Sequence, residues 1–560
     1  MAITLAMLPP TSWDGLFYHL KGPKLYLEAG RIVGGIDIPH LNFPSLFQMW
    51  FLLAIGIRGE VAAQLVHILF LFVLGGMVYA FAREHFGLKD GWTAVLFLYA
   101  TPMVLTLSTW SYNDLGLAFF NAGAVYAFLK WQKGNMGRRL TQINADEKKV
   151  SASSASFRVQ SYDLRWLAVS GVFAGLAMSM KYTSVVGPAA LGLLLLWQGR
   201  RDWRAGVKPV VVFAGTAVLV LAPWLIKNAI FTGNPVYPFV FNGLFWDEFR
   251  AAGYSNSGSG IGFDIIAMLR LPYDMMLGIR DASQDGRTGA LFLAFLPFVL
   301  FYAFRKKNGT QIDMINADEE KENPASFRVL PRPNNSLRTI LLVSLAYYLF
   351  WVVGVIGSQG LWQTRLLLPM FTLLCPVLAW VFEEIREFDH EQFSLRRFLN
   401  MGLAFVLLLI GLNQLWEWIP AQPWAYLSGA ETRDEHLTRR LGAHYAAMQA
   451  LNEQLPPDAV VKFFWEPRSY YCDLDCHPDS ILDAFDHLVY LHGDAESIAV
   501  ALREEGVTHV LIFQTGLDFI VESPESQSGV ETAVLSNFRT NHLEPAFSIA
   551  EGSYLVFTLK

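Results

Sequence analysis

Residues 61–82 read VAAQLVHILFLFVLGGMVYAFA, an apolar stretch without any Asp, Glu, Lys or Arg. An α-helix rises about 1.5 Å per residue, so about 20 apolar residues are needed to cross a hydrocarbon core of about 30 Å. This stretch is long enough, and it predicts a transmembrane helix.

Similar apolar runs recur along most of the chain and predict an α-helical polytopic membrane protein with about 10–11 spans. The further runs are 92–108, 112–131, 166–180, 183–198, 209–228, 288–304, 338–357, 365–383 and 398–416. The run 44–57 is shorter and follows Pro44, which favours an interfacial or re-entrant helix over a span.

The composition excludes several classes of protein. Of 560 residues, 53% are hydrophobic and only 16% are charged, whereas about 25% of an ordinary soluble domain is charged. The chain is therefore neither a soluble globular enzyme nor a disordered protein. A formal net charge of −6 provides no basic field, which argues against nucleic acid as a partner. Three cysteines exclude a disulfide scaffold.

The basic residues predict the orientation of the spans. More than half of the 43 Lys and Arg fall in one alternating set of loops, which the positive-inside rule assigns to the cytoplasm. These loops are 83–91, 130–165, 199–208, 305–338 and 384–397. The remaining segments then all face the other side: 9–60, 109–111, 181–182, 229–287, 358–364 and everything from 417 onward. We expect an integral protein of the bacterial inner (plasma) membrane.

The N-terminus raises a question about the first span. Only Met1 to Leu8 precede the external segment 9–60, and eight residues cannot cross the membrane. The stretch also lacks the basic region of a signal peptide. We expect either that a first transmembrane helix is missing or that the chain begins within the membrane.

The cytoplasmic inserts 132–165 and 305–337 contain near-duplicate polar sequences. These read TQINADEKKVSASSASFRV at 141–159 and TQIDMINADEEKENPASFRV at 310–329. Because they are polar and poor in aromatic residues, we expect mobile insertions and not repeats that share a core.

The sequence changes character after a transmembrane domain of residues 1–416, and 417–560 reads as a small extracytoplasmic α/β domain. Strands are predicted at 459–465, 487–491, 508–513 and 554–559, with a helix at 497–506. Strand, helix and strand in this order predict a small mixed sheet with one βαβ unit. No glycine-rich phosphate loop marks it as a nucleotide site.

Cys472 and Cys476 lie in YYCDLDCHPD, on the side of the membrane where a disulfide is permitted. A local disulfide is one interpretation. The neighbouring Asp473, Asp475 and His477 suggest a metal-binding loop as another, but their spacing matches no standard zinc pattern, which favours a surface turn.

Ionisable residues at the external membrane face are the candidates for chemistry, because charged groups are expensive to place at the edge of the hydrocarbon. They are Asp14 in the first loop, Asp114 in TWSYNDLGLAFF, Lys181 in the tight turn SMKYTS and Arg365 in QGLWQTRLLLPMF. Singly, Asp114 is explained as a helix cap, and Lys181 and Arg365 as snorkelling side chains. Because all of them share one face, we predict a common site.

The order of these elements resembles that of the GT-C superfamily of lipid-phosphosugar glycosyltransferases, which includes protein mannosyltransferases and the lipid A aminoarabinose transferase. The shared pattern is an acid opening a long first loop, a second acid before a span, a Lys-Tyr turn and a Pro-Trp span end. Here these are Asp14, Asp114, Lys181 with Tyr182, and PWLIKNAIFTGNPVYPF at 223–239. The likeness is good over 9–240 and looser over 338–384. Family members often have a paired acid where this chain has Asp14 followed by Gly15.

The resemblance implies transfer of a sugar from a polyprenyl-phosphate donor to an envelope acceptor, a lipid, glycan or protein, on the non-cytoplasmic face, with inversion. It implies Asp14 as the base and Asp114 as the residue that orients the acceptor or helps hold a cation. Lys181 and Arg365 would bind the donor phosphate. Weaker candidates for the same cavity are Tyr18, His19, Lys227 and Asn234.

The resemblance leaves the sugar, the acceptor and the metal requirement open: no cofactor is certain, and a divalent cation is an option. Membrane lipids are expected partners. The aromatic and glycine-rich loop 230–262 is suited to folding over a lipid-linked substrate.

Two other functions compete with the transferase. A transporter or flippase of a lipid-linked intermediate would place its charges near the bilayer midplane, whereas here they gather at one face. An envelope protein whose C-terminal part binds a partner is the third interpretation.

Overall fold

The structure, a computed structural model, describes residues 1–148, 164–200, 202–255, 258–278, 288–305, 334–390, 392–522 and 532–560. The duplicate sequence at 310–329 and most of the one at 141–159 lie outside these residues. Helices occur at all the predicted apolar runs, and the polytopic helical fold expected from the sequence is confirmed.

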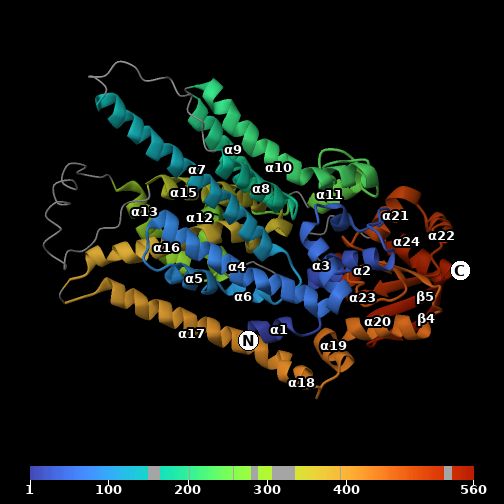
Figure 1. Ribbon diagram of the computed structural model, residues 1–560. Helices are drawn as coiled ribbons and strands as arrows, with labels where there is room; N and C mark the ends of the chain where they lie inside the picture. Colours follow the sequence, from blue (N-terminus) through green and yellow to red (C-terminus); the bar gives the residue numbers. More distant parts are fainter. Residues whose placement is uncertain are drawn as a thin grey trace.

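Long helices form a bundle that extends away from a mixed sheet at one end of the molecule (Figure 1). Within the described residues, five helices are long and apolar enough to cross a membrane. They are α4 (Glu60–Phe86), α10 (Trp203–Thr232), α15 (Asn334–Gly357), α16 (Leu368–Glu384, extended by short turns at both ends) and α17 (Leu395–Ala421). The other predicted spans correspond to shorter or more polar helices: α5 (Trp92–Tyr99), α6 (Pro102–Ser108), α7 (Asp114–Lys148), α8 (Arg165–Met178), α9 (Val186–Gly199) and α13 (Leu291–Phe304).

Two helix boundaries differ from the prediction. The run 92–108 is divided into α5 and α6, because Pro102 forces the preceding Thr101 into an extended conformation. The insert predicted to begin as a loop at residue 132 instead continues α7 to Lys148. This stretch contains no proline and is rich in Lys, Gln and Arg, which favour helices.

Helix α16 is the central element of the bundle. Of its most apolar window, 83% is buried, against 17% for α10 and α17 at the periphery. Helices α8 and α10 approach closely because Gly171 and Gly175 have no side chains: a Cβ on Gly171 would lie 2.4 Å from the carbonyl oxygen of Phe213. Small residues four apart are typical of close helix contacts in membranes.

Short elements join the bundle to its sheet end. They are α1 (Ala2–Ala6), a π-helical turn η1 (Gly15–His19), α2 (Lys21–Glu28), η2 (Pro39–Asn42), α3 (Leu46–Arg58), η4 (Tyr182–Val185), α11 (Glu248–Ser255), α12 (Ile265–Leu277), η6 (Gln359–Leu361), η7 (Thr364–Leu367) and η8 (Ile385–Phe388). We call residues 9–45 the N-terminal loop. Helix α3, at the run 44–57, has 13 residues, too few for a perpendicular span of about 20.

The C-terminal region, residues 422–560, contains a five-stranded sheet of order β2-β1-β3-β5-β4. Strand β1 is parallel to β2 and β3, and β5 is antiparallel to β3 and β4. Its strands are β1 (Val460–Phe464), β2 (Asp475–His477), β3 (His509–Phe513), β4 (Leu543–Ile549) and β5 (Tyr554–Leu559). Its helices are α18 (Pro423–Leu427), α19 (Arg433–Leu441), α20 (Ala443–Gln454), α21 (Ala484–His492), α22 (Ala495–Glu504), α23 (Gln514–Glu522) and α24 (Thr532–Asn537).

The strand predicted at 487–491 is wrong, because this stretch lies in helix α21. A short apolar run does not distinguish a strand from a helix. In this protein the Asp479 carboxylate favours the helix, because it accepts hydrogen bonds from the backbone N–H groups of Asp483 and Ala484 and so caps the first turn. The predicted βαβ order is present between β1 and β3, which are parallel neighbours.

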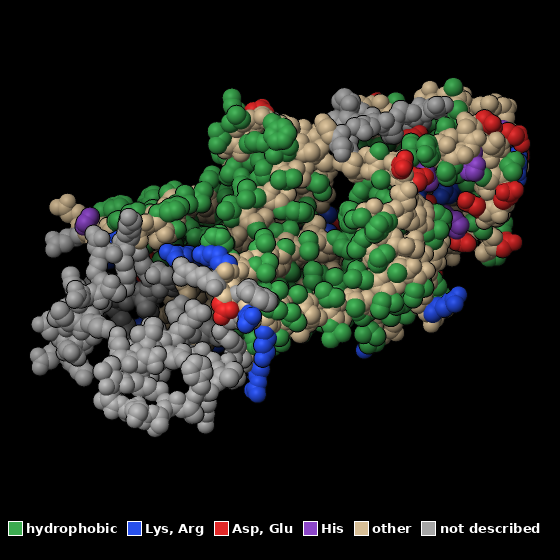
Figure 2. Space-filling view, turned by 90° about the horizontal axis from the view of Figure 1, so that it is seen from above, with side chains coloured by type: hydrophobic (Ala, Val, Ile, Leu, Met, Phe, Trp, Pro, Cys, Tyr) green, Lys and Arg blue, Asp and Glu red, His purple; other side chains and the backbone are tan. Residues whose placement is uncertain are grey.

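The two faces of the sheet belong to different cores. Val461 and Phe463 join the large core that continues into the bundle, whereas Phe464 and Val510 join a second core under α21 and α22. On the face shown in Figure 2, hydrophobic side chains cover the long body and acidic side chains gather at the sheet end, whereas Lys and Arg side chains occur at both ends. The C-terminal region is therefore packed onto the bundle and not tethered loosely to it.

Candidate active site

Asp14 lies immediately before the π-helical turn η1. Its carboxylate Oδ2 accepts a hydrogen bond from Nη2 of Arg365 at 2.7 Å, and both side chains are largely buried, 17% and 10% exposed. These residues are 351 positions apart in the sequence. The fold therefore pairs the predicted base with a predicted phosphate ligand.

Arg365 is held on two further sides. Gln363 Oε1 accepts hydrogen bonds from its Nε and Nη2 at 3.2 and 3.1 Å, and its guanidinium lies 5.1 Å from the centre of the Tyr112 ring. The backbone N–H of Asp14 donates to the Tyr112 hydroxyl at 3.2 Å. Tyr112 thus touches both members of the ion pair and fixes their relative position.

The electrostatic surroundings keep Asp14 ionised. Burial raises the pKa of its carboxyl group, but Arg365 and, more weakly, Lys181 lower it, and the result is a pKa below the ordinary value. Lys181 precedes the short turn η4, and Asn113 Nδ2 donates to the neighbouring carbonyl of Met180 at 3.3 Å. The predicted Lys-Tyr turn therefore lies within electrostatic range of Asp14.

Asp114 is the first residue of α7 and is buried. The cap of this helix comes from another residue: Nε2 of His67 accepts a hydrogen bond from the Leu115 N–H at 3.3 Å, while Nδ1 pairs with the Trp110 carbonyl at 2.7 Å. Asp114 contributes to raising the pKa of Tyr18, which burial raises most. It therefore lies in the same electrostatic environment as Asp14.

Tyr18 and His19 line the same turn. Their rings are 4.1 Å apart, and Nδ1 of His19 lies 2.8 Å from the Gln48 amide nitrogen. Since an amide N–H₂ only donates, Nδ1 accepts and the ring is the Nε2–H tautomer. Burial holds the pKa of His19 well below its usual range, so His19 is neutral and polar at pH 7.

The structure places Lys227 and Asn234 further from this pair, in contacts with backbone carbonyls. Lys227 Nζ donates to the carbonyls of Leu41 and Phe43 at 2.7 and 3.4 Å and so connects α10 to the N-terminal loop. Asn234 is fully buried and donates to the carbonyls of Phe239 and Phe241. Both contacts shape the loops around the site.

Several residues of the site had not been identified from the sequence. His40 stacks on Tyr18 with ring centres 4.8 Å apart, and the Tyr254 hydroxyl of α11 lies 3.3 Å from His40 Nε2. Gln48 and His67 interrupt apolar runs, and such interruptions are a signal that identifies candidate residues in a sequence. Tyr112 carried no comparable signal.

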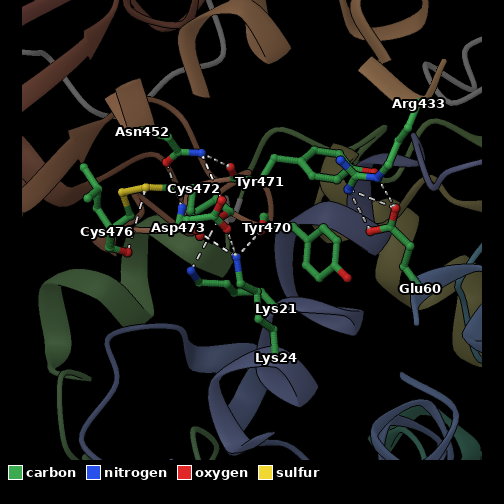
Figure 3. A network of polar contacts seen from close by, with 12 residues as sticks. Lys21, Lys24, Glu60, Arg433, Asn452, Tyr470, Tyr471, Cys472, Asp473 and Cys476 are labelled. Carbon is green, nitrogen blue, oxygen red and sulfur yellow. Dashed lines mark hydrogen bonds and ion pairs between the residues drawn. A yellow bond between two sulfur atoms is a disulfide. The ribbon is translucent and has the colours of Figure 1, made fainter. Parts of the chain in front are cut away.

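The C-terminal region makes several polar contacts with the N-terminal loop, which carries Asp14 (Figure 3). Lys24 Nζ donates to the carbonyls of Tyr470 and Cys472, both at 3.0 Å, and pairs with Asp473 at 2.8 Å. Lys21 Nζ donates to the Ser469 carbonyl at 3.3 Å.

Further contacts complete this interface. The Tyr471 hydroxyl donates to the Pro10 carbonyl at 2.7 Å, and Arg433 of α19 pairs with Glu60 at the start of α4. Arg468 covers the Trp13 ring at 4.2 Å, directly beside Asp14. The segment around 468–473 therefore positions the start of the candidate site.

Cys472 and Cys476 form a disulfide within this segment. In the described part of the chain, no group of three or more His, Cys, Asp or Glu side chains is arranged to hold a metal ion. A Cβ at position 15 would lie 2.4 Å from Ser12 Oγ, so a second acid there would require the Ser12 hydroxyl to rotate away. Gly15 is thus a close-packing position.

The helical bundle with its capping sheet has the architecture of a polytopic membrane protein. The structure is similar to ArnT, an aminoarabinose transferase, from Cupriavidus metallidurans bound to undecaprenyl phosphate. The TM-score is 0.52 at 14% identity, over 99% of this chain and 95% of that one. This likeness confirms the fold that the sequence resemblance implied.

The other matches have lower TM-scores or cover less of the chain. Apo ArnT from Cupriavidus metallidurans has a TM-score of 0.48 at 14% identity, over 99% of this chain and 95% of that one. The archaeal oligosaccharyltransferase AglB from Archaeoglobus fulgidus has 0.42 at 11%, over 99% and 73%. A family model described as a domain of unknown function, DUF8201, matches residues 156–250. No curated protein matches the sequence.

Proposed function

We propose that this protein is an integral-membrane glycosyltransferase that moves a sugar from a polyprenyl-phosphate donor to an envelope acceptor on the non-cytoplasmic face. The observation that carries the proposal is the buried ion pair of Asp14 and Arg365, in a fold similar to that of a transferase solved with undecaprenyl phosphate. A carboxylate beside a guanidinium supplies the base and the phosphate ligand that this chemistry needs.

In the proposed reaction, an acceptor hydroxyl oxygen attacks the anomeric carbon of the donor. The bond between that carbon and the phosphate oxygen breaks, and the polyprenyl phosphate leaves with the electron pair. Asp14 takes the hydroxyl proton. Displacement from the opposite face inverts the configuration at the anomeric carbon.

The ion pair links the basicity of Asp14 to binding of the donor. An aspartate paired with Arg365 has a lowered pKa and is a weak base. When a donor phosphate shares the guanidinium, Asp14 loses part of its partner and its pKa rises. We propose that donor binding in this way prepares the base for proton transfer.

Lys181 lies in electrostatic range of Asp14 and provides a second positive charge for the phosphate. Asp114, buried at the start of α7, is proposed to orient the acceptor. Tyr18 and neutral His19 offer polar contacts to the bound sugar, and Lys227 and Asn234 hold the surrounding loops. The loop 230–262 provides Tyr254 as part of a lid.

The test is transfer of radiolabelled sugar in proteoliposomes from a panel of polyprenyl-phosphate monosaccharides. We expect one donor to be used by the wild-type chain and by Asp458→Asn, a control at an exposed turn. Asp14→Asn should lose this transfer. Transport of an intact lipid-linked sugar across the bilayer, without transfer, would instead support a flippase.

A further inference from the structure

A second cavity lies away from the ion pair, between the N-terminal loop, α11 and the C-terminal region. Its volume is about 420 Å³, within the range of small-molecule sites. Helices α11 and α21 lie side by side at this point (Figure 1), and the Phe249 ring stacks on Tyr490 with centres 4.9 Å apart. The cavity is thus closed by segments distant in the sequence.

Lys462 of strand β1 lines this cavity. It is 7% exposed, and within the described part of the chain its ammonium group makes no hydrogen bond or close ion pair. Its ammonium nitrogen is not among the fully buried polar atoms without a partner, so it borders the cavity, and the carboxylates of Asp37 and Asp479 act on it through space. The ammonium group can therefore donate hydrogen bonds to a group that enters the cavity.

The other charges near Lys462 already have partners. Arg250 pairs with Asp37, Nη2 to Oδ2 at 3.1 Å, and with Asp483 at 3.1 Å. Asp479, whose charge also acts on Lys462, accepts three backbone N–H groups.

The imidazoles of the lining are engaged in the same way. His477 pairs with Asp475 at 3.0 Å, and His487 pairs with Asp247 at 2.8 Å. His492 and Glu505 are exposed at the rim. Among the described lining residues, Lys462 is consequently a cation whose hydrogen bonds are open to a ligand.

The remaining walls are apolar. Ile38, Phe245, Leu488 and Leu491 line the cavity, and sugar rings present apolar faces that pack on such side chains. We propose that the cavity binds a small saccharide whose anion, a carboxylate or a phosphate monoester, is held by Lys462. This site is separate from the Asp14 site, and its existence does not depend on the transferase reaction.

The test is binding to the full chain in detergent, measured by calorimetry with glucuronate and glucose 6-phosphate as probes. Glucose and inorganic phosphate are the comparison ligands, because each carries only half of the proposed recognition. We expect the anionic sugars to bind more tightly than either, and Lys462→Met to weaken them about tenfold or more, as expected for loss of a charge-assisted hydrogen bond. Lys89→Met, at an exposed lysine, should bind like wild type.

Some outcomes would overturn the proposal. Equal binding of glucose and glucuronate, or unchanged binding in Lys462→Met, would show that the lysine does not hold an anion. If Lys462 only balances Asp37 and Asp479, wild type binds neither probe and the variant is merely less stable. Should Lys462→Met fail to fold, Leu491→Trp fills the cavity from a half-exposed position, and retained binding in that variant would contradict the site.

Discussion

The N-terminal loop uses charge differently at Asp14 and at Lys24. At Asp14, a carboxylate meets a guanidinium inside the protein. At Lys24, an ammonium group binds two backbone carbonyls and a largely exposed aspartate, an arrangement that holds the loop to the C-terminal region. The first arrangement suits proton transfer and phosphate binding, and the second suits positioning of the loop, so changes at Asp14 and at Lys24 should have different effects.

Apart from replacement of the proposed base itself, the largest effect is expected from Arg365→Ala. Loss of the proposed phosphate ligand should lower transfer by about 10²- to 10³-fold, the typical cost of removing one transition-state donor. Arg365→Lys should recover part of this activity, because it keeps the charge but not the fork that reaches Gln363 and Asp14. Steady-state kinetics over a range of donor concentrations measure the activities of both variants. Equal rates for Arg365→Ala and Arg365→Lys would contradict a role of Arg365 in phosphate binding.

A smaller effect is expected when the disulfide is removed. Replacing Cys472 and Cys476 by serine releases a short loop, which should cost about 2 kcal/mol of stability by the chain-entropy model. Chemical denaturation of the purified protein measures this loss. Because the bridge lies in the segment that holds Lys24 and not at the ion pair, transfer should fall only modestly. A loss as large as that of Arg365→Ala would mean that this segment takes part in the chemistry.

Lys24→Met should cost about 1 kcal/mol, because a partly solvent-exposed ammonium group contributes less than a buried one. Its transfer rate should fall while the donor KM stays close to the wild-type value, since no contact to the donor is removed. Lys89→Met provides the matched control. A raised donor KM in Lys24→Met would place this residue in the donor site.

The smallest effect is the response of stability to acid. The folded-state pKa of Asp14 is below its unfolded value, so its pairing stabilises the protein above the unfolded pKa of about 4 and this contribution is lost as the pH falls through the folded value. Thermal unfolding between pH 7 and pH 3 should show a smaller acid-induced loss in Asp14→Asn than in wild type. Identical pH dependence would mean that the ion pair is not formed in solution.

The apolar runs predicted the helices because length and hydropathy are local properties of a membrane span. They did not predict the break at Pro102 or the helical nature of 487–491, where Asp479 supplies a cap from outside the run. The candidate residues were found by their chemistry and their expected side of the membrane. The pairing of Asp14 with Arg365 was not predicted, because these two residues meet only through the tertiary structure.

Sequence patterns did not identify Tyr112, His40 and Tyr254 either, because these residues join the candidate site only through tertiary contacts. Tyr112 matters because it touches Asp14 and Arg365 together, and His40 matters because it stacks on Tyr18. The cavity at Lys462 likewise depends on contacts between the N-terminal loop, α11 and the C-terminal region.

The most direct test of the central claim is single-turnover transfer by Asp14→Asn loaded with donor. The account predicts that the variant still binds the polyprenyl-phosphate sugar through Arg365 and Lys181, while transfer falls about 10²- to 10⁴-fold, the usual contribution of a general base. Full transfer by the variant would show that Asp14 is not the base and would contradict the account.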